Sequence, residues 1–346
     1  MSGKVSEKCD RKVWIDMLKG FGILLVLIGH SHCPKMFDKF IYGFHMPLFF
    51  ILSGYLFNDT YYKKSNIKSY VIKKWNAYII PYFVLSLCNL IITLIIKLLA
   101  KVSLNDLVRL VYKYLFFIFY SFGDASKMPN CSPLWFLPCL FIAYIYLFIF
   151  IRFNNKIKCM TLIIGVFIIQ FLVNLNITQL PWHFDIAFIG MIFMYIGIFL
   201  RRLNITMVVK QKKIFVGMAG ILSILFNDRA DMVWRQFGNL FLFFIGATCM
   251  VILLICLFTK LTDNSFGGRL ISWIGRNSMY YMGFNLLINC CINIIDKRTF
   301  NINAFTYGWI VYVIINLVTI AIGIIVLKKL KSKLNNYLMK YQHYQC

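Results

Sequence analysis

The first long apolar run of the chain holds three ionisable residues, Asp16, Lys19 and His30. Such residues cost free energy inside a bilayer, which makes each of them a candidate functional residue. Asp16 and Lys19 are three positions apart and can pair on one face of a helix. Lys19 and His30 are eleven positions apart, so at about 100° per residue they return to nearly the same face, with a rise of about 16 Å between them. One helix face thus offers a cation and, further along, an imidazole, which suits an elongated anionic ligand whose reactive end lies beside His30.

A purely structural role is also open for each of these residues. Asp16 and Lys19 could form an ion pair near the headgroups, with the lysine side chain reaching back to the interface. His30 could be a histidine at the outer end of a span that hydrogen-bonds to a backbone carbonyl. Further residues are needed to choose between these readings.

The second apolar run carries another histidine, His45, near its beginning. Because only residues 31–39 separate the two runs, the ends that carry His30 and His45 should meet on one side of the membrane. Two converging histidines could act as a base and its partner. A metal site would need more ligands, and His32 is the only obvious third, so no metal is expected. Ser53 could be a nucleophile, although small residues within spans are more often packing positions.

The elements that must position these side chains are membrane spans. The chain has 346 residues, of which 60% are hydrophobic and 14% charged, and the hydrophobic residues come in long runs. The mean hydropathy is +0.74. The formal net charge of +25 does not indicate a nucleic-acid binder, because Lys and Arg sit between the apolar runs, where they set topology and contact anionic lipid headgroups. The eleven cysteines show no metal-ligand spacing and mostly lie within apolar runs. The composition therefore predicts an all-α polytopic membrane protein, and no nucleic-acid partner.

Runs of about 20 apolar residues predict about ten transmembrane helices in a single domain that covers residues 1–346. The segment 107–120 is only half apolar and is expected to be an interfacial or re-entrant helix. The first run lacks a small-residue cleavage site, so it is expected to be a retained span. With both termini cytoplasmic, 25 of the 37 Lys and Arg residues fall on the cytoplasmic side and 11 on the other, which favours this orientation in the cell (inner or plasma) membrane. The expected spans are 14–32, 40–57, 78–99, 133–151, 159–175, 185–200, 214–226, 239–259, 270–292 and 306–327.

Two long motifs give the chain a family resemblance. The run from Asp16 to His30 and the run from Phe44 to Tyr55 resemble the opening signature of the membrane-bound acyltransferase type 3 family, and most of all its fucose 4-O-acetylase-like branch. The segments Pro133 to Pro138 and Ile274 to Ser278 are similar to further family features. The ten-span core of that family has the topology expected above.

The resemblance implies transfer of an acetyl group from cytoplasmic acetyl-CoA to a sugar hydroxyl of a cell-envelope or lipid-linked glycan, such as an exopolysaccharide. His30 would be the catalytic base that takes the proton of the attacking hydroxyl, with His45 as its partner. Lys19 and Asp16 would lie at the donor-binding end, and Lys74 would join Lys19 in meeting the donor phosphates. The expected partners are the glycan acceptor, membrane lipid and other proteins of polysaccharide biosynthesis, and no metal is expected.

The chain departs from the family pattern at two positions. Ala77 stands where many relatives have the second residue of a basic pair, of which Lys74 fills the first place. Asn285 stands where many relatives have a histidine. The first departure puts the donor contacts in doubt, and the second puts in doubt a secondary role for position 285.

Acceptor contacts are less sharply predicted. Trp135 could stack on a sugar ring, although an interfacial anchor is the more common use of this residue. Ser53 and Tyr55 of the second motif are further candidates for substrate binding. The outer loops 181–185 and 227–235 concentrate aromatic and polar side chains that suit carbohydrate or simply solvent.

A transporter or flippase for a glycan or small solute is the rival function, since intramembrane Asp, Lys and His residues can relay protons. Against it, the sequence shows no inverted repeat and no matched pair of broken spans. A relative that has lost catalysis and serves as a partner subunit is a third possibility. The acceptor sugar, the hydroxyl that is modified and the oligomeric state are not encoded in any readable motif.

Overall fold

The computed structural model describes residues 12–124, 127–128, 130–175, 180–262, 264–296 and 307–343. These residues form helices and connecting loops, and the described part of the chain contains no β-strand, only an isolated bridge between Asp231 and Gln236. The prediction of an all-α polytopic membrane protein is therefore confirmed. In chain order the α-helices are α1 (Val13–Gly29), α2 (Lys35–Tyr42), α3 (His45–Tyr55), α4 (Asp59–Lys64), α5 (Ile67–Lys74), α6 (Ile80–Leu99), α7 (Leu104–Tyr120), α8 (Phe136–Phe150), α9 (Asn155–Asn174), α10 (Phe184–Arg202), α11 (Ile205–Val208), α12 (Lys213–Phe226), α13 (Leu240–Phe258), α14 (Phe266–Arg276), α15 (Ser278–Asp296) and α16 (Gly308–His343).

Several helices have long, exposed apolar surfaces that suit contact with lipid. In the described residues, seven helical stretches are long and apolar enough to cross a membrane: Ile67–Leu99, Ser132–Phe150, Asn155–Val173, Pro181–Arg202, Leu240–Phe258, Ser278–Asp296 and Gly308–Lys333. The stretch Asn155–Val173 is only 6% buried inside the protein, and its Phe167 and Phe171 are 71% and 62% exposed. A helix with such a surface belongs in the hydrocarbon core, where its backbone groups are satisfied internally.

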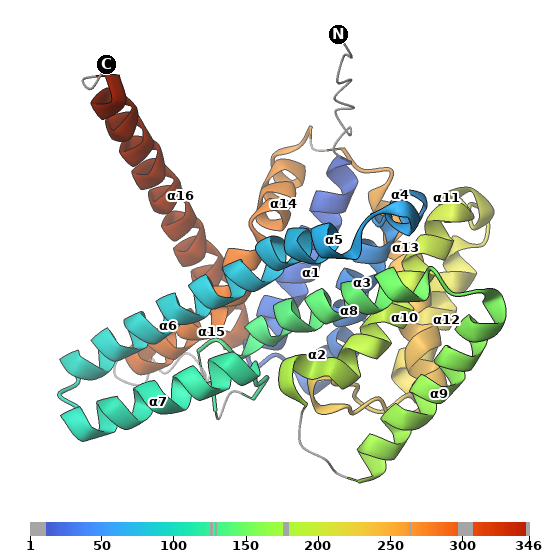
Figure 1. Cartoon of the computed structure of the whole chain (residues 1–346), viewed down its shortest axis with the longest axis horizontal. Helices are drawn as coiled ribbons and strands as arrows, with labels where there is room; N and C mark the ends of the chain where they lie inside the picture. Colours follow the sequence, from blue (N-terminus) through green and yellow to red (C-terminus); the bar gives the residue numbers. More distant parts are fainter. Residues whose placement is uncertain are drawn as a thin grey trace.

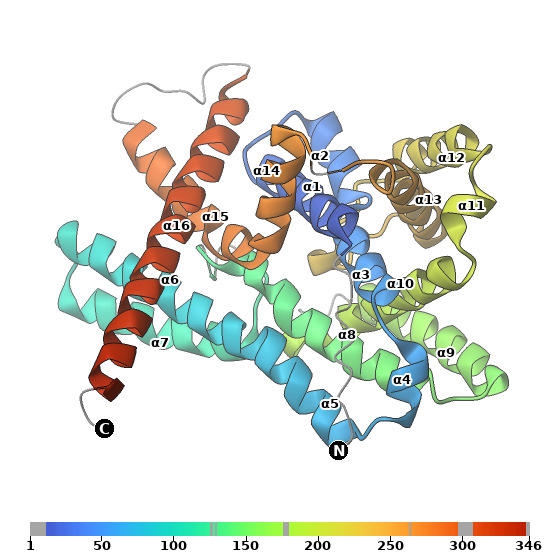
Figure 2. The ribbon, with the colours of Figure 1, turned by 90° about the horizontal axis from the view of Figure 1, so that it is seen from above.

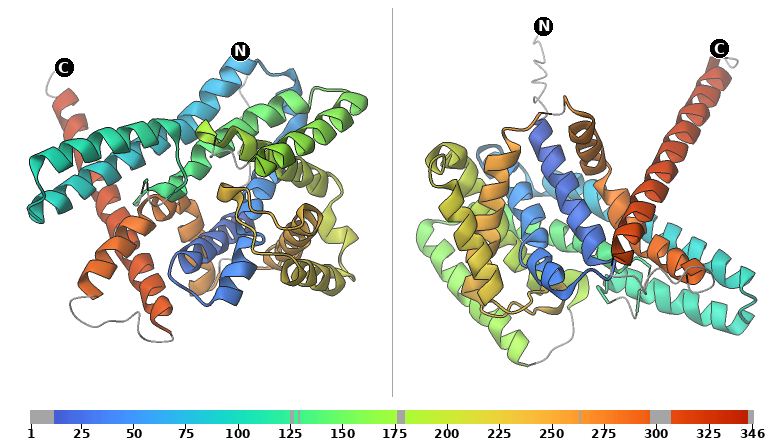
Figure 3. Two further views of the ribbon diagram at one scale, coloured as in Figure 1. Left: turned by 90° about the horizontal axis from the view of Figure 1, so that it is seen from below. Right: turned by 180° about the vertical axis from the view of Figure 1, so that it is seen from behind.

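The helices are arranged around α1 and α3. Figure 1 shows α1 near the middle of the bundle, with α14 beside it and α16 projecting away. Seen from above, α12 and α13 lie side by side on one flank, and α6 and α7 form a pair on the other (Figure 2). α1 begins and α16 ends on the same side of the molecule (Figure 3, right), as expected for termini that share one side of the membrane.

Glycine lets two of these helix pairs approach closely. A Cβ atom on Gly275 of α14 would lie 1.8 Å from the carbonyl oxygen of Asp16 in α1, and one on Gly54 of α3 would lie 1.8 Å from the carbonyl oxygen of Met194 in α10. Contact between backbones through small residues is the usual way that membrane helices associate. Gly54, next to Ser53, therefore has a packing function.

Two of the expected spans are broken into separate helices. The range 270–292 covers α14 and α15, which meet at Asn277, and the range 40–57 covers the end of α2 and all of α3. At the first break the Asn277 side chain donates to the carbonyl of Trp273 (2.7 Å) and accepts from Lys328 (2.9 Å). An asparagine that bonds to a nearby carbonyl competes with helical backbone bonding, and Lys328 lies on a helix far away in the sequence. Apolar runs alone do not reveal such breaks.

The segment expected to be interfacial or re-entrant is α7, which runs antiparallel to α6 (Figure 1). The Tyr82 hydroxyl of α6 donates to the carbonyl of Ile118 in α7 at 2.6 Å, which fixes the pair. α7 returns the chain toward the start of α8. Whether α7 lies at the interface stays a prediction, as does the count of ten crossings, because α1, α3 and α12 have only 17, 11 and 14 residues.

Candidate functional site

A cavity of about 620 Å³ runs along one face of α1. Its wall includes Lys19, Ile23, Val26 and His30, which follow one another at helical spacing. α2, α3, α8, α15 and the loop 227–239 supply the other walls. One continuous space therefore connects the lysine of the first motif with its histidine.

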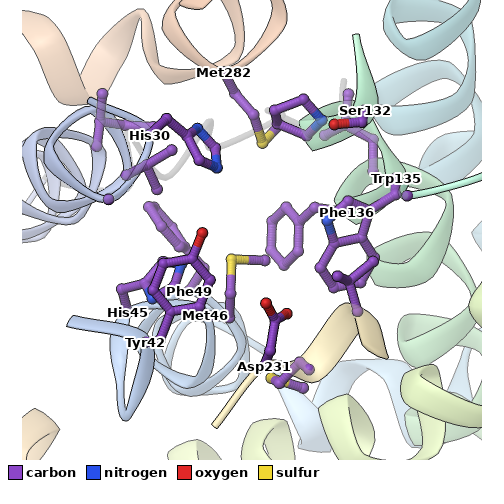
Figure 4. A pocket seen from close by; sticks show the side chains of 18 of the residues that line it. His30, Tyr42, His45, Met46, Phe49, Ser132, Trp135, Phe136, Asp231 and Met282 are labelled. Carbon is purple, nitrogen blue, oxygen red and sulfur yellow. The ribbon is translucent and has the colours of Figure 1, made fainter. Parts of the chain in front are cut away.

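His30 is held by asparagines from the last two helices. It is the first residue after α1, and its ring points into the cavity (Figure 4). Its Nδ1 atom lies 2.9 Å from the side-chain amide nitrogen of Asn285, and its carbonyl oxygen accepts from the Asn289 amide at 2.9 Å. Asn316 of α16 in turn donates to Asn289 at 2.6 Å. Asn285 and Asn316 are fully buried, so His30 is held by a buried network of asparagine hydrogen bonds.

His45 is the first residue of α3, and it is buried at the wall of the same cavity. Its Nδ1 atom lies 2.9 Å from the carbonyl oxygen of Ile41, which can only accept, so Nδ1 carries the proton and Nε2 is an acceptor. The Tyr42 ring meets the imidazole edge to face, with centroids 4.8 Å apart. The structure thus brings the two motif histidines to one cavity, each with its ring held by a neighbour.

The inner part of the cavity, around Lys19, is also lined by side chains that carry hydroxyl groups. Ser53 of α3 and Tyr78 line it together with Lys19. Ser278, the first residue of α15, also lines the cavity, beside the break between α14 and α15. Phosphates would find a cation and hydroxyl donors there.

Three of the predicted site residues lie elsewhere. Asp16 is buried where α1 contacts α14, and it does not line the cavity. The Lys74 ammonium lies 3.4 Å from the ring centroid of Tyr144 and 5.7 Å from those of Tyr70 and Tyr78, so aromatic faces cover it outside the cavity wall. Tyr55, at the end of α3, packs edge to face on a tryptophan of α1 at 5.5 Å and is likewise not part of the wall.

The other end of the cavity is aromatic and acidic. Trp135 lines it, and its ring packs against the His183 ring with the two centroids 4.7 Å apart. Figure 4 shows the Tyr42 hydroxyl and the Asp231 carboxylate pointing into the space beside His30. Sequence reasoning missed Tyr42, which is the last residue of α2 and lies close to His45 because a short turn joins α2 to α3. We call this end the outer vestibule and define it by Tyr42, Trp135 and Asp231.

One arginine ties the two sides of the outer vestibule together. Arg229 bonds to Asp38 of α2 and, at 3.1 Å, to Asp231, and its guanidinium carbon lies 4.0 Å from the Tyr42 ring centroid. Burial raises the pKa of the Asp231 carboxyl, and the Arg229 guanidinium opposes that rise. The loop itself is anchored by a buried ion pair between Arg235 and Asp185 (3.2 Å). The carboxylate of Asp231 is therefore fixed in place before any ligand arrives.

No group of three or more His, Cys, Asp or Glu side chains that could hold a metal ion occurs in the described parts of the chain. The two motif histidines have protein partners of their own at Nδ1.

The fold and the cavity define a polytopic helical membrane protein with a buried site that connects an intramembrane lysine to two histidines. A family model described as an acyltransferase domain, that of the membrane-bound acyltransferase type 3 family, matches residues 12–328. The chain belongs to this family and is a membrane acyltransferase. Neither the curated proteins nor the solved structures contain a match to it.

Proposed function

We propose that this acyltransferase moves an acetyl group from cytoplasmic acetyl-CoA to a sugar hydroxyl of a cell-envelope or lipid-linked glycan, as a member of the fucose 4-O-acetylase-like branch. The observation that carries the proposal is the cavity along α1, which joins Lys19 to His30 over a rise of about 16 Å. Acetyl-CoA is elongated, with phosphates far from its thioester. Such a donor fits with its anionic part toward Lys19 and its acetyl group beside His30.

His30 acts as the general base in this proposal. The sugar hydroxyl attacks the thioester carbon while Nε2 of His30 takes its proton, and the tetrahedral intermediate then collapses with loss of the CoA thiolate, to which the imidazolium returns the proton. The oxygen–carbon bond forms and the carbon–sulfur bond breaks. A thioester is already activated, so alignment of donor and acceptor supplies much of the remaining rate.

Asn285 is the positioning residue for this base. For Nε2 to accept a proton, Nδ1 must carry one and needs an acceptor. The amide nitrogen of Asn285 lies 2.9 Å from Nδ1. Rotating the amide group by 180° about its Cβ–Cγ bond puts the amide oxygen in that position, where it can accept the Nδ1 proton. Asn285 thus takes the part that a histidine would take in relatives, which argues against loss of catalysis.

His45 and Ser53 have different parts. With Nδ1 donated to Ile41, His45 presents Nε2 to the cavity, where it can accept from the incoming hydroxyl and orient it. Ser53 lies eight positions further along α3, about 12 Å away along the helix axis. That distance suits contact with the donor rather than attack on its acetyl group, so we favour direct transfer over a Ser53 acyl-enzyme.

Location and partners complete the proposal. The protein is a multi-pass membrane protein, and we place it in the cell (inner or plasma) membrane, where acetyl-CoA is available on one side and envelope glycans on the other. Membrane lipid and other polysaccharide-biosynthesis proteins are the partners we expect beside the acceptor. No metal is required by the chemistry, and membership of an acyltransferase family argues against the transporter alternative.

The test is release of free thiol from acetyl-CoA by the purified protein, with and without a crude envelope glycan extract. His30→Ala should lower release by about 10²- to 10⁴-fold, while donor affinity measured by calorimetry stays within about twofold. His343→Ala, a histidine at the end of α16, is the matched control and should behave as wild type. Full activity of His30→Ala would refute the role of the base. A folded wild type that neither binds nor cleaves acetyl-CoA would refute the function.

A further inference from the structure

We propose that the outer vestibule binds an uncharged sugar unit of the acceptor and discriminates against sugars that carry a carboxylate or a phosphate. This inference rests on the proposed acetyl transfer and narrows its acceptor class. It depends on three features of the vestibule: its charge, its aromatic walls and the fixed carboxylate of Asp231.

The charges along the cavity are separated by sign. Among the described residues of its wall, the carboxylates are Asp38, Asp124 and Asp231, all at the outer end, whereas the lysine of the wall, Lys19, lies toward the other end of α1. Arg229 neutralises part of this charge from behind by pairing with Asp38 and Asp231. Asp38 and Asp231 carry two carboxylates against the one guanidinium of Arg229, so this side of the vestibule is negative. A uronic acid or a sugar phosphate would meet repulsion that water screens poorly in a partly buried site.

The remaining surface of the vestibule suits the faces of a neutral pyranose. The rings of Tyr42 and Trp135 lie on different sides of the space beside His30, with Phe136 between them and Phe49 on the side of Tyr42 (Figure 4). Aromatic rings offer flat apolar contact together with a polar edge, here the Tyr42 hydroxyl and the indole N–H of Trp135. A sugar ring presents apolar C–H faces and polar edges, so it matches this arrangement.

Asp231 is placed to orient the sugar hydroxyls. Its carboxylate points into the vestibule (Figure 4), and its backbone is bridged to Gln236 on the other side of the loop. A carboxylate has about four lone-pair sites, so Asp231 can bond to Arg229 and still accept from sugar hydroxyls. Because Arg229 also touches the Tyr42 ring, the hydroxyl acceptor and the stacking surface are held by one side chain. This arrangement presents one sugar hydroxyl to His30.

The experiment uses purified full-length enzyme, acetyl-CoA and matched sets of methyl glycosides. Each set contains a neutral hexoside of the gluco, galacto or fuco series. Where the C6 group allows, the set also contains the uronate and the 6-phosphate of the same configuration. Acetylation is followed by mass spectrometry. A neutral glycoside should be acetylated with a kcat/KM at least about tenfold above that of its anionic counterparts. Equal or better use of a uronate or phosphate overturns the inference, and so does failure to acetylate any neutral glycoside while acetyl-CoA is still hydrolysed.

A substitution that removes the charge of Asp231 and keeps its shape separates this inference from the proposed function. Asp231→Asn keeps the shape of the side chain and should lower kcat/KM for the neutral glycoside by about 10- to 100-fold and narrow the gap to its uronate. Asp228→Asn, an exposed residue of the same loop, is the matched control. Unchanged acceptor kinetics in Asp231→Asn overturn the inference and leave the proposed function standing, whereas loss of all donor turnover in wild type removes both.

Discussion

Replacing Asn285 by leucine removes the side-chain amide that lies 2.9 Å from Nδ1 of His30 and leaves the volume of the side chain nearly unchanged. The imidazole becomes positively charged in the transition state, so the lost hydrogen bond is one to a charged group. Such bonds contribute about 1.5–3 kcal/mol. At about 1.36 kcal/mol per factor of ten, kcat should fall by about 10- to 150-fold.

The assay compares kcat and KM for acetyl-CoA in the wild type and in Asn285→Leu. KM should change less than about twofold, since Asn285 does not line the cavity. Asn285→His should restore most of kcat, because an imidazole nitrogen can also accept the Nδ1 proton of His30. A merely structural role would lower the unfolding temperature and would not be rescued in kcat by histidine. If Asn285→Leu keeps kcat within about twofold, the positioning of His30 by this amide is refuted.

Three further outcomes are expected. Lys19→Met should raise KM for acetyl-CoA by about 10- to 100-fold, whereas Lys74→Met should change it less than about threefold, because aromatic rings cover the Lys74 ammonium outside the cavity; steady-state kinetics check both, and the reverse order would contradict the assignment. Gly275→Ala puts a Cβ 1.8 Å from a carbonyl oxygen of α1 and should destabilise the fold by about 1–3 kcal/mol in thermal unfolding in detergent, while Gly267→Ala, with open space around it, should not. Burial alone would raise the pKa of Asp59, but two arginines hold it below its ordinary value of 3.8, so the stability that this carboxylate contributes is present above that pH and is lost as the pH falls through the lowered pKa. The difference in unfolding temperature between wild type and Asp59→Asn should therefore be largest near neutral pH and shrink in acid, and a constant difference would contradict this account.

Helical periodicity explains why part of the site can be predicted from the sequence. Lys19 and His30 belong to one helix, and the spacing of eleven residues fixes their shared face whatever the rest of the protein does. His45 follows after a connection too short to separate it from His30. The long apolar runs likewise predict an all-α membrane fold, because continuous runs of about 20 apolar residues suit transmembrane helices and not the alternating strands of a barrel.

Contacts between segments that are distant in the sequence cannot be predicted from helical periodicity. Asn285 lies 255 positions from His30, and although the family resemblance draws attention to position 285, the sequence does not show that its side chain contacts His30. The composition of the loop 227–235 suits carbohydrate, but only the folded loop shows that Asp231 is the carboxylate that lines the cavity. The family resemblance predicts that Lys74 meets the donor phosphates together with Lys19, whereas only the structure shows that tyrosine rings cover its ammonium.

The sequence by itself determined the class of fold, the face of the first helix that carries the lysine and the histidine, and the family to which the chain belongs. Only the tertiary structure decided which asparagine holds the histidine, where α14 and α15 part, and which carboxylates surround the outer vestibule. The physical reason is that helical spacing is set by backbone geometry over a few residues. The choice of neighbours is set by close packing between helices, through glycines such as Gly275, whose effect depends on residues far away in the chain.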